Sequence, residues 1–343
     1  MTAKEKILGY VQKKITVTGK DLSEILGISR QAVNKHLKIL IQDNHIVKVG
    51  STKGTTYRLP SSRREPPSVL KIKKSYILKG LEEDQVFLEI APRLNLNKDL
   101  NQSAFNIAHY AFTEMLNNAI DHSLSENCLV NVSLDRYRFN FRIRDYGIGI
   151  FHSIFTKFHL ADEYAAIGEL IKGKTTTMKE KHSGEGIFFT SKAADSVFFR
   201  SHKIELNFDN QKQDVFIQEK KFIKGTEVVF TISRRSRRKL DKIFSQFAPE
   251  EFDYQFERTR ALVKLFHQNY ISRSEAKRLL YGLDKFKQIT LDFKGVKSIG
   301  QGFADEIFRV FSDTHPEIEI KVENISPALE PMIKHTVDNK FNN

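Results

Sequence analysis

The chain has 343 residues, which suits two or three domains, and a formal net charge of +13 at pH 7. Its single cysteine, Cys128, excludes an intrachain disulfide framework and a cysteine-based zinc site, and it suits a reducing cytoplasm. No apolar run reaches the length of about 18 residues that a membrane-spanning helix needs. We therefore expect a cytoplasmic protein with no signal peptide and no membrane partner.

Two short helices separated by a turn are expected near the N-terminus. Residues 18–27 are typical of a helix that ends at a glycine, Gly27. Ser29 is a favoured residue for capping the next helix, and residues 30–40 have the apolar spacing of an amphipathic helix. The arrangement of helix, turn and helix is that of a helix-turn-helix.

A basic hairpin is expected after the second helix. Residues 46–59 predict two short strands around a basic, glycine-bearing tip, which looks like a wing. Residues 1–60 therefore resemble the winged-helix DNA-binding domains of bacterial regulators, and the resemblance implies double-stranded DNA as a partner. The side chains expected to reach base edges and phosphates are Ser29, Arg30, Gln31, Asn34, Lys35, Lys38 and Lys53.

Most of the positive charge lies in the first 74 residues, which hold 16 lysines and arginines against 5 aspartates and glutamates. This part alone contributes +11 to the net charge. A field concentrated on one small domain attracts polyanions, with an affinity that falls as salt rises. A solvated basic face, or a winged helix that contacts only protein, is the alternative interpretation.

Composition indicates two domain boundaries. Residues 60–68 hold three of the chain's eight prolines, so we expect a linker over residues 61–79. A basic run at residues 233–239 marks a second boundary, and we place a connector at residues 234–250. The expected domains are residues 1–60, 80–233 and 251–343.

The central region contains a helix with three polar residues on one side. Glu114, Asn118 and Asp121 lie within about 60° of one another around the helix axis. The opposite, core-facing stripe consists of Phe105, Ala108, Phe112, Leu116 and Ala119. An asparagine oxygen suits Mg²⁺, and a glutamate one turn away can orient or deprotonate a water molecule. Ordinary polar residues on a wet helix face are the alternative.

A strand hairpin and a glycine turn follow this helix. Residues 131–145 alternate apolar and polar side chains, which predicts two strands that end at Asp145. Gly147 and Gly149 allow the backbone to approach a ligand closely. The carboxylate before them can accept a hydrogen bond from an exocyclic amine such as that of adenine. Taken alone, the motif is also an ordinary turn after a strand.

Two further stretches suit phosphate binding. Residues 172–186 are basic and polar, and Lys174 suits a lid over phosphates, although the spacing is not that of a Walker loop. Gly184 and Gly186 precede a predicted helix, whose N-terminus attracts anions. Thr226 opens a predicted strand, where its hydroxyl can contact a phosphate.

Together these stretches resemble the GHKL ATPase fold of gyrase, MutL-type repair proteins, heat-shock chaperone ATPases, histidine kinases and anti-sigma-factor kinases. The resemblance implies an α/β sandwich, with a mixed sheet and helices on one face, that binds ATP and Mg²⁺. It implies Glu114 as the general base, Asn118 as the Mg²⁺ ligand and Asp145 as the adenine contact. The other residues expected around the nucleotide are Asp121, Gly147, Gly149, Lys174, Gly184, Gly186 and Thr226.

Strands and helices alternate over the last third, which indicates an α/β domain. Strands are expected at residues 252–256, 259–266, 288–293 and 317–322, and helices at 272–282, 301–311 and 327–335. Residues 291–303 resemble the STAS fold of anti-sigma antagonists, which implies a protein partner. Where those antagonists carry a phosphorylated serine, this chain has glycine and glutamine at residues 300–302. Ser298 is the remaining candidate acceptor, and regulatory contact without phosphotransfer is favoured.

The sequence thus predicts an α+β multidomain protein with a winged helix, a GHKL domain and a STAS-like domain. Two function classes remain. The first is a DNA-binding regulator whose ATP state controls its binding to DNA or to a partner. The second is a serine/threonine protein kinase of the anti-sigma type. The eleven histidines show no metal-ligand spacing, and homodimerisation stays open.

Overall fold

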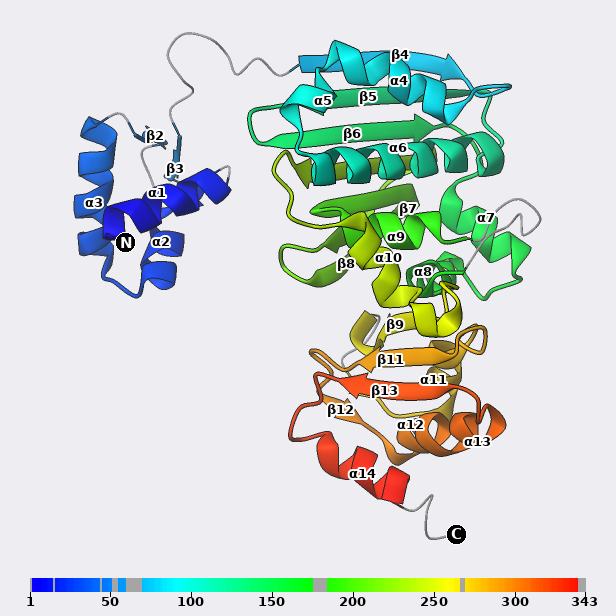
Figure 1. The fold of residues 1–343 in the computed structure, drawn as a ribbon. Helices are drawn as coiled ribbons and strands as arrows, with labels where there is room; N and C mark the ends of the chain where they lie inside the picture. Colours follow the sequence, from blue (N-terminus) through cyan, green and yellow to red (C-terminus); the bar gives the residue numbers. More distant parts are fainter. Residues whose placement is uncertain are drawn as a thin grey trace. The chain divides into compact units, whose positions relative to one another are not determined.

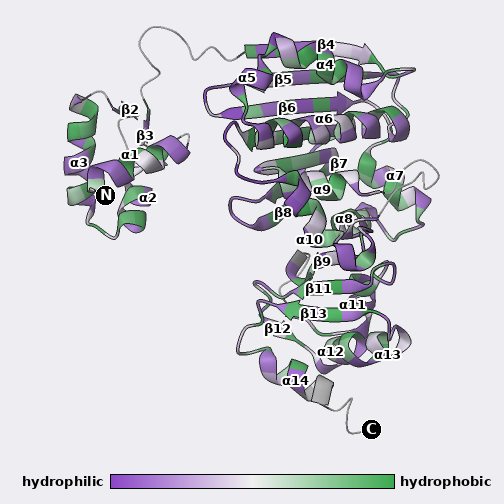
Figure 2. Ribbon diagram, in the orientation of Figure 1, coloured by the Kyte–Doolittle hydropathy of each residue, from purple (hydrophilic) through white to green (hydrophobic). Residues whose placement is uncertain are grey.

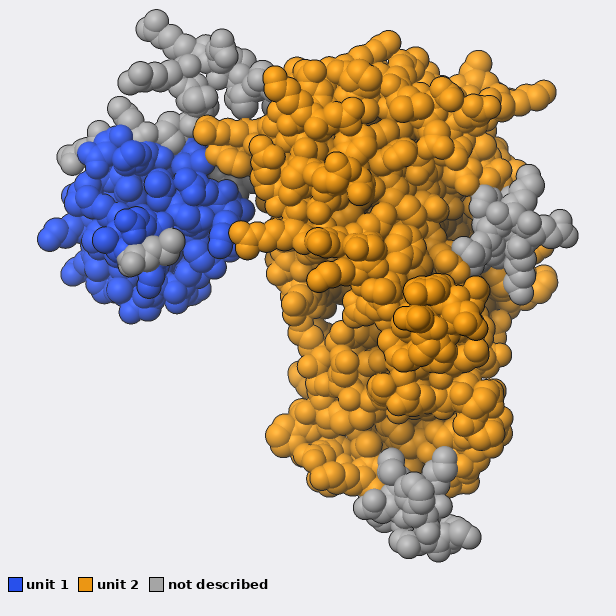
Figure 3. Space-filling view, viewed as in Figure 1, with its two compact units in different colours: residues 1–69 blue, residues 70–343 orange. Residues whose placement is uncertain are grey.

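The computed structural model describes residues 2–14, 16–43, 45–50, 55–59, 70–174, 184–265 and 269–338. Contacts divide the chain into two compact units, residues 1–69 and residues 70–343, which Figure 3 colours separately. The division falls within the proline-bearing segment that composition marks as a linker. Among the described residues, none of the helices combines the length and apolar character needed to cross a membrane.

The described part of the first unit is a three-helix domain with a small sheet (Figure 1). Its elements are α1 Ala3–Lys13, β1 Val17–Thr18, α2 Gly19–Leu26, α3 Arg30–Gln42, β2 Val47–Val49 and β3 Thr56–Arg58. The strands pair in the order β1-β3-β2, and both pairings are antiparallel. Ile7, Leu22, Val33 and Leu37 lie in its buried core.

Local signals set the limits of the two helices expected here. Gly27 ends α2 with a φ of 64°, in the left-handed region that glycine adopts at little cost. The Ser29 hydroxyl caps α3 by accepting a hydrogen bond from the Ala32 N–H at 3.2 Å. The predicted helix ends are therefore confirmed. Strands β2 and β3 form the expected hairpin, whose tip, with Lys53, lies outside the described residues.

The second unit begins with a five-stranded sheet. Its strands are β4 Leu70–Ile77, β5 Asn127–Leu134, β6 Arg138–Asp145, β7 Ser196–Asp209 and β8 Asp214–Ser233, in the order β4-β5-β6-β8-β7. Every neighbouring pair is antiparallel. The expectation of a mixed sheet is therefore wrong. Short hairpins join β5 to β6 and β7 to β8, and such connections reverse the chain direction.

The edge strand β4 also corrects the predicted linker. Residues 61–79 were expected to connect two domains, but Leu70–Ile77 pairs along its whole length with β5. Most of its side chains are exposed, and Tyr76 is the buried one. The apolar alternation that predicts a strand is incomplete here, because Lys74 interrupts the apolar positions of an edge strand that is little covered.

Helices cover one face of the sheet, as expected (Figure 1). They are α4 Glu83–Arg93, α5 Leu96–Asp99, α6 Gln102–His122, α9 Gly186–Ala193 and α10 Leu240–Phe247, with α7 Ile150–Lys157 and α8 Glu163–Lys172 at one end. Figure 2 shows hydrophobic and hydrophilic residues interleaved along α6. Its predicted stripe is buried at Ala108, Phe112, Leu116 and Ala119, and Phe112 meets Phe141 of β6 at a ring distance of 5.4 Å.

The C-terminal part is built on a parallel sheet of three strands. Strands β9 Arg258–Leu262, β11 Gln288–Asp292 and β13 Glu319–Glu323 lie in the order β13-β11-β9, and β10 Asn269–Tyr270 pairs in parallel with β12 Ser298–Ile299. The helical segments are η1 Glu250–Phe252, η2 Val263–Leu265, α11 Arg273–Leu280, α12 Gln301–Asp305, η3 Glu306–Phe311, α13 Ser312–Thr314 and α14 Glu330–Asp338.

One prediction for the C-terminal part is confirmed and another is wrong. Ser272 and Glu275 form the expected capping box at the start of α11. The strand expected at residues 252–256 is absent, because η1 and a turn occupy this stretch. Asp253 and Tyr254 both have positive φ, at 51° and 58°, which is incompatible with a strand.

The C-terminal core is continuous with the central domain. Phe188 and Phe189 project from α9 into an aromatic cluster of this core, at ring distances of 4.7 and 5.1 Å from Phe256. The buried ammonium group of Lys172 donates hydrogen bonds to Glu169 and to the Tyr281 carbonyl. Residues 70–343 therefore pack as one unit.

Candidate functional site

Two of the predicted nucleotide-binding stretches meet at Asp145. This carboxylate ends β6 and is buried, with 5% of its surface exposed. Its Oδ1 accepts one hydrogen bond from the Gly147 N–H and one from the Thr226 N–H, both at 3.0 Å. The Thr226 hydroxyl in turn accepts a hydrogen bond from the Ile150 N–H at 2.9 Å. The junction connects β6, the glycine turn, the start of α7 and β8.

Burial governs the acid–base behaviour of Asp145. It raises the pKa of this carboxyl above its usual value, and the hydrogen bonds from Gly147 and Thr226 oppose the shift. A carboxylate held away from water interacts strongly with any additional donor, because the surrounding dielectric constant is low. Chemically, this group is an acceptor for a buried N–H.

The glycines at this junction are required by close packing. A Cβ on Gly147 would lie 1.7 Å from the Ser123 carbonyl oxygen at the end of α6, and one on Gly225 would lie 2.5 Å from Asp145 Oδ1. The same Ser123 oxygen accepts a hydrogen bond from the Ile148 N–H at 2.8 Å. The turn after β6 is therefore docked on the last residues of α6.

A second junction joins α6 to α9. A Cβ on Gly186 would lie 1.9 Å from Glu114 Oε2, so the first residue of α9 touches this carboxylate directly. Tyr110, one turn before Glu114, has a pKa raised above its usual value by burial and then by the charges of Glu114 and Glu185. The carboxylates of Glu114 and Glu185 thus both act on Tyr110 beside the N-terminus of α9, with Gly184 just before it.

The remaining predicted nucleotide contacts are placed differently. Asn118 and Asp121 are half-buried further along α6. Lys174 forms an ion pair with Glu257 at 3.1 Å and donates a hydrogen bond to the Lys285 carbonyl at 3.0 Å. Contact of Lys174 with a phosphate stays a prediction, and it would require the Lys174 ammonium group to leave Glu257. Most of the predicted lid, residues 175–183, lies outside the described residues.

The predicted nucleic-acid face of α3 is solvent-exposed. Val33, Leu37 and Leu40 are buried on the inner side of the helix. The side chains expected to contact DNA are all exposed on the outer side, namely Ser29, Arg30, Gln31, Asn34, Lys35 and Lys38. The helix therefore separates an apolar face that anchors it from a polar, basic face available to a partner.

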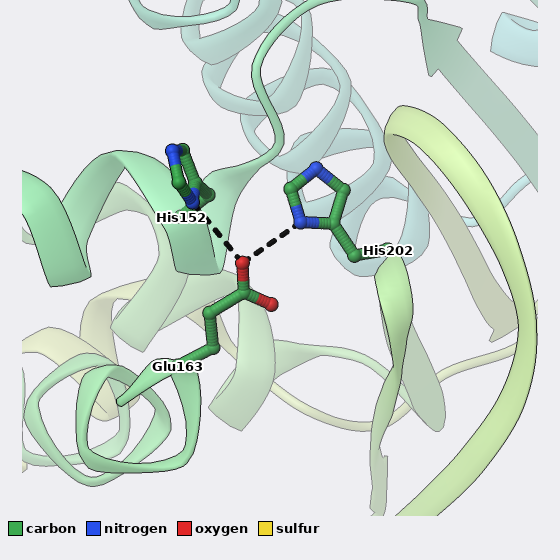
Figure 4. Close-up of side chains that lie close together, drawn as sticks. All are labelled: His152, Glu163 and His202. Carbon is green, nitrogen blue, oxygen red and sulfur yellow. Dashed lines mark hydrogen bonds and ion pairs between the residues drawn. The ribbon is translucent and has the colours of Figure 1, made fainter. Parts of the chain in front are cut away.

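Sequence reasoning missed one cluster of chemistry-bearing side chains. His152, Glu163 and His202 have ligand atoms within 4.8 Å of one another (Figure 4). They come from α7, α8 and β7, so no short spacing along the chain predicts the group. Lys192 was also missed; burial lowers its pKa to about 8, and its ammonium group lies 4.9 Å from the centre of the Phe188 ring.

Comparison with known families supports the predictions for the two ends of the chain. Residues 4–58 match the family described as an HTH domain. The chain has an N-terminal helix-turn-helix domain. Residues 275–330 match a STAS-like domain of unknown function (DUF4325), in agreement with the C-terminal parallel sheet. Neither match includes the central antiparallel sheet.

Comparison with whole proteins adds little. No curated protein matches the chain. A crystal structure described as a GntR-family transcriptional regulator aligns with 69% of this chain and 96% of its own, at 11% identity and a TM-score of 0.14. A TM-score this low carries no argument about the fold.

Proposed function

We propose that this protein is a DNA-binding regulator in which ATP, held with Mg²⁺ by the central domain, sets the affinity for DNA or for a partner. The helix-turn-helix match and the exposed polar face of α3 support DNA binding. The observation that carries the proposal of nucleotide binding is the junction at Asp145. There, N–H groups of the glycine turn and of β8 donate to one carboxylate oxygen at the end of β6.

In this proposal Asp145 accepts the exocyclic amine of adenine. Both backbone N–H groups end on Oδ1, which holds the carboxylate in one orientation and directs Oδ2 to the base. Gly225 packs tightly against the carboxylate, and Gly147 packs against Ser123 at the end of α6, so the position of Asp145 is set before a ligand arrives. A preorganised acceptor loses little conformational entropy on binding.

The phosphates and Mg²⁺ would lie between α6 and α9. The N-terminus of α9 is the positive end of a helix dipole, which favours anions. Glu114, in contact with Gly186, would activate the attacking water, and Asn118, one turn along α6, would bind Mg²⁺. Asp121 lies on the same side of the helix, a turn further from α9.

Nucleotide binding would be coupled to the C-terminal part through Lys174. Its ammonium group now pairs with Glu257 and contacts the Lys285 carbonyl, both of which flank the parallel sheet. A phosphate that recruits Lys174 would break these contacts. Such a competition gives the protein two alternative arrangements that ATP can bias.

A second candidate function is a serine/threonine protein kinase of the anti-sigma type. The observation in its favour is the STAS-like domain within the same compact unit, with Ser298 exposed on β12. Incubation with γ-labelled ATP separates the two functions. Release of free phosphate supports an ATP-driven switch, whereas label transferred to protein supports a kinase.

The central experiment measures DNA binding without nucleotide, with ADP and with a non-hydrolysable ATP analogue. Genomic fragments selected for binding serve as the probe, and the salt dependence is recorded in each state. We expect the affinity to differ between the ADP and ATP-analogue states. Equal affinity in all three states contradicts control of DNA binding by the nucleotide.

A further inference from the structure

Three side chains outside the proposed nucleotide contacts converge near one end of the central sheet (Figure 4). His152 lies on α7, Glu163 is the first residue of α8, and His202 lies in β7. Glu163 Oε1 is 2.8 Å from His202 Nδ1 and 3.2 Å from His152 Nδ1. All three side chains are partly shielded from solvent.

Local structure holds His202 and Glu163 in position. His202 has a φ of 51° and lies at an irregularity in the pairing of β7 with β8. Its ring stacks on Phe222 at 5.2 Å. Glu163 is oriented by the start of α8, where Asp162 caps the helix through the Ala165 N–H at 2.8 Å. Positive φ at a non-glycine residue persists only where the surrounding structure maintains it.

We propose that His152, Glu163 and His202 bind a divalent transition-metal ion of the zinc class. Two imidazole nitrogens and one carboxylate oxygen form a ligand set that leaves a fourth position for water or another ligand. Metal–ligand bonds of about 2.0–2.2 Å separate neighbouring ligand atoms by about 3–3.5 Å. The two distances to Glu163 Oε1 are within a few tenths of an ångström of this range.

This ligand set differs from the one proposed for Mg²⁺. Imidazole nitrogens suit zinc, nickel, cobalt and copper, whereas Mg²⁺ prefers oxygen ligands. The zinc-class site is therefore separate from the one that includes Asn118. The alternative is a metal-free cluster in which both Nδ1–H groups donate to the same carboxylate oxygen. Measured zinc uptake distinguishes the two possibilities.

The position of the site gives it a structural role. Gly149 immediately precedes α7 as its N-cap residue, and a Cβ on Gly149 would lie 3.1 Å from His202 Nε2. The helix that Glu163 opens, α8, ends at Lys172, two residues before Lys174. An ion at this site would connect both helices to β7. It would thereby stiffen the path from the glycine turn to the start of the predicted lid.

The test titrates a zinc salt into metal-free, nucleotide-free full-length protein by calorimetry. We expect one ion per chain. His152→Ala, His202→Ala and Glu163→Gln should each lower the affinity by at least about tenfold. Glu163→Gln keeps the size of the side chain and one acceptor oxygen, so its circular dichroism spectrum should match the wild type.

His159→Asn is the matched control. This histidine is exposed just beyond the end of α7 and has a φ of 50°, which asparagine tolerates. The variant should bind zinc as the wild type does. X-ray absorption of the zinc-loaded protein should show nitrogen and oxygen neighbours without sulfur, because the one thiol, Cys128, is buried elsewhere in the sheet.

Two results would overturn the proposal. One is the lack of stoichiometric zinc uptake by the wild type, and the other is equal uptake by all three substituted proteins. Since no nucleotide is present, either result leaves the proposed ATP function untouched. Conversely, failure of ATP binding does not change the expected zinc stoichiometry.

Discussion

Replacement of Asp145 separates its structural contribution from its proposed contact with adenine. In Asp145→Ala, the Gly147 and Thr226 N–H groups both lose their acceptor inside the protein. A buried donor left without a partner costs about 1–3 kcal/mol. The two together predict a loss of about 2–6 kcal/mol in the free energy of unfolding.

Asp145→Asn should behave differently. An asparagine oxygen can accept both backbone hydrogen bonds, and the substitution removes a buried charge. Because burial raises the pKa of Asp145 in the folded protein, the ionised form disfavours folding relative to the protonated form. We therefore expect the stability of Asp145→Asn at neutral pH to stay within about 1 kcal/mol of the wild type.

The pH dependence has a defined sign. The wild type should gain stability relative to Asp145→Asn as pH falls toward the ordinary aspartate pKa of about 3.9, since the folded state binds the proton more tightly. Urea unfolding followed by circular dichroism measures these differences, because the chain has no tryptophan. A separate calorimetric titration with Mg-ATP should show lost affinity in both variants, since the asparagine amide would present a donor to the adenine amine.

Two outcomes would refute this reasoning. If Asp145→Ala unfolds within about 1 kcal/mol of the wild type, the two hydrogen bonds do not hold the junction together. If Asp145→Asn binds Mg-ATP with undiminished affinity, the carboxylate does not recognise adenine. The first result concerns the fold and the second concerns the ligand.

Further predictions concern the other sites. Glu114→Ala should retain nucleotide but lose hydrolysis, measured as phosphate release; undiminished turnover would remove the general base. Asn118→Ala should weaken Mg-ATP binding in calorimetry, and unchanged affinity would exclude it as a ligand. Arg30→Glu with Lys35→Glu should abolish a gel shift that Lys13→Glu, an exposed change on α1, preserves. Burial lowers the pKa of Lys192 to about 8 in the folded protein. The free energy of unfolding of the wild type, relative to that of Lys192→Met, should therefore rise between about pH 8 and about pH 10.5. A difference between the two proteins that does not change with pH would exclude the lowered pKa.

Local signals in the sequence determined much of the helical structure. Ser29 caps α3 as expected, and Gly27 ends α2, because both effects depend on backbone groups a few residues away. The stripe that includes Phe112 and Leu116 is buried on α6, since a period of 3.6 residues specifies which side of a helix meets the core. Local patterns also placed Glu114 on a helix and Asp145 at the end of a strand, as the structure has them.

Only the tertiary structure decided what those elements meet. Strand β4 forms because β5 offers an unpaired edge, and the interrupted apolar alternation of Leu70–Ile77 does not reveal this pairing. Lys174 reaches Glu257, and His152 reaches His202, across separations that no spacing rule covers. Such contacts depend on how separate elements bury their apolar faces against each other. The same long-range packing made the β4–β5 and β6–β8 pairings antiparallel, since no short hairpin joins these strands.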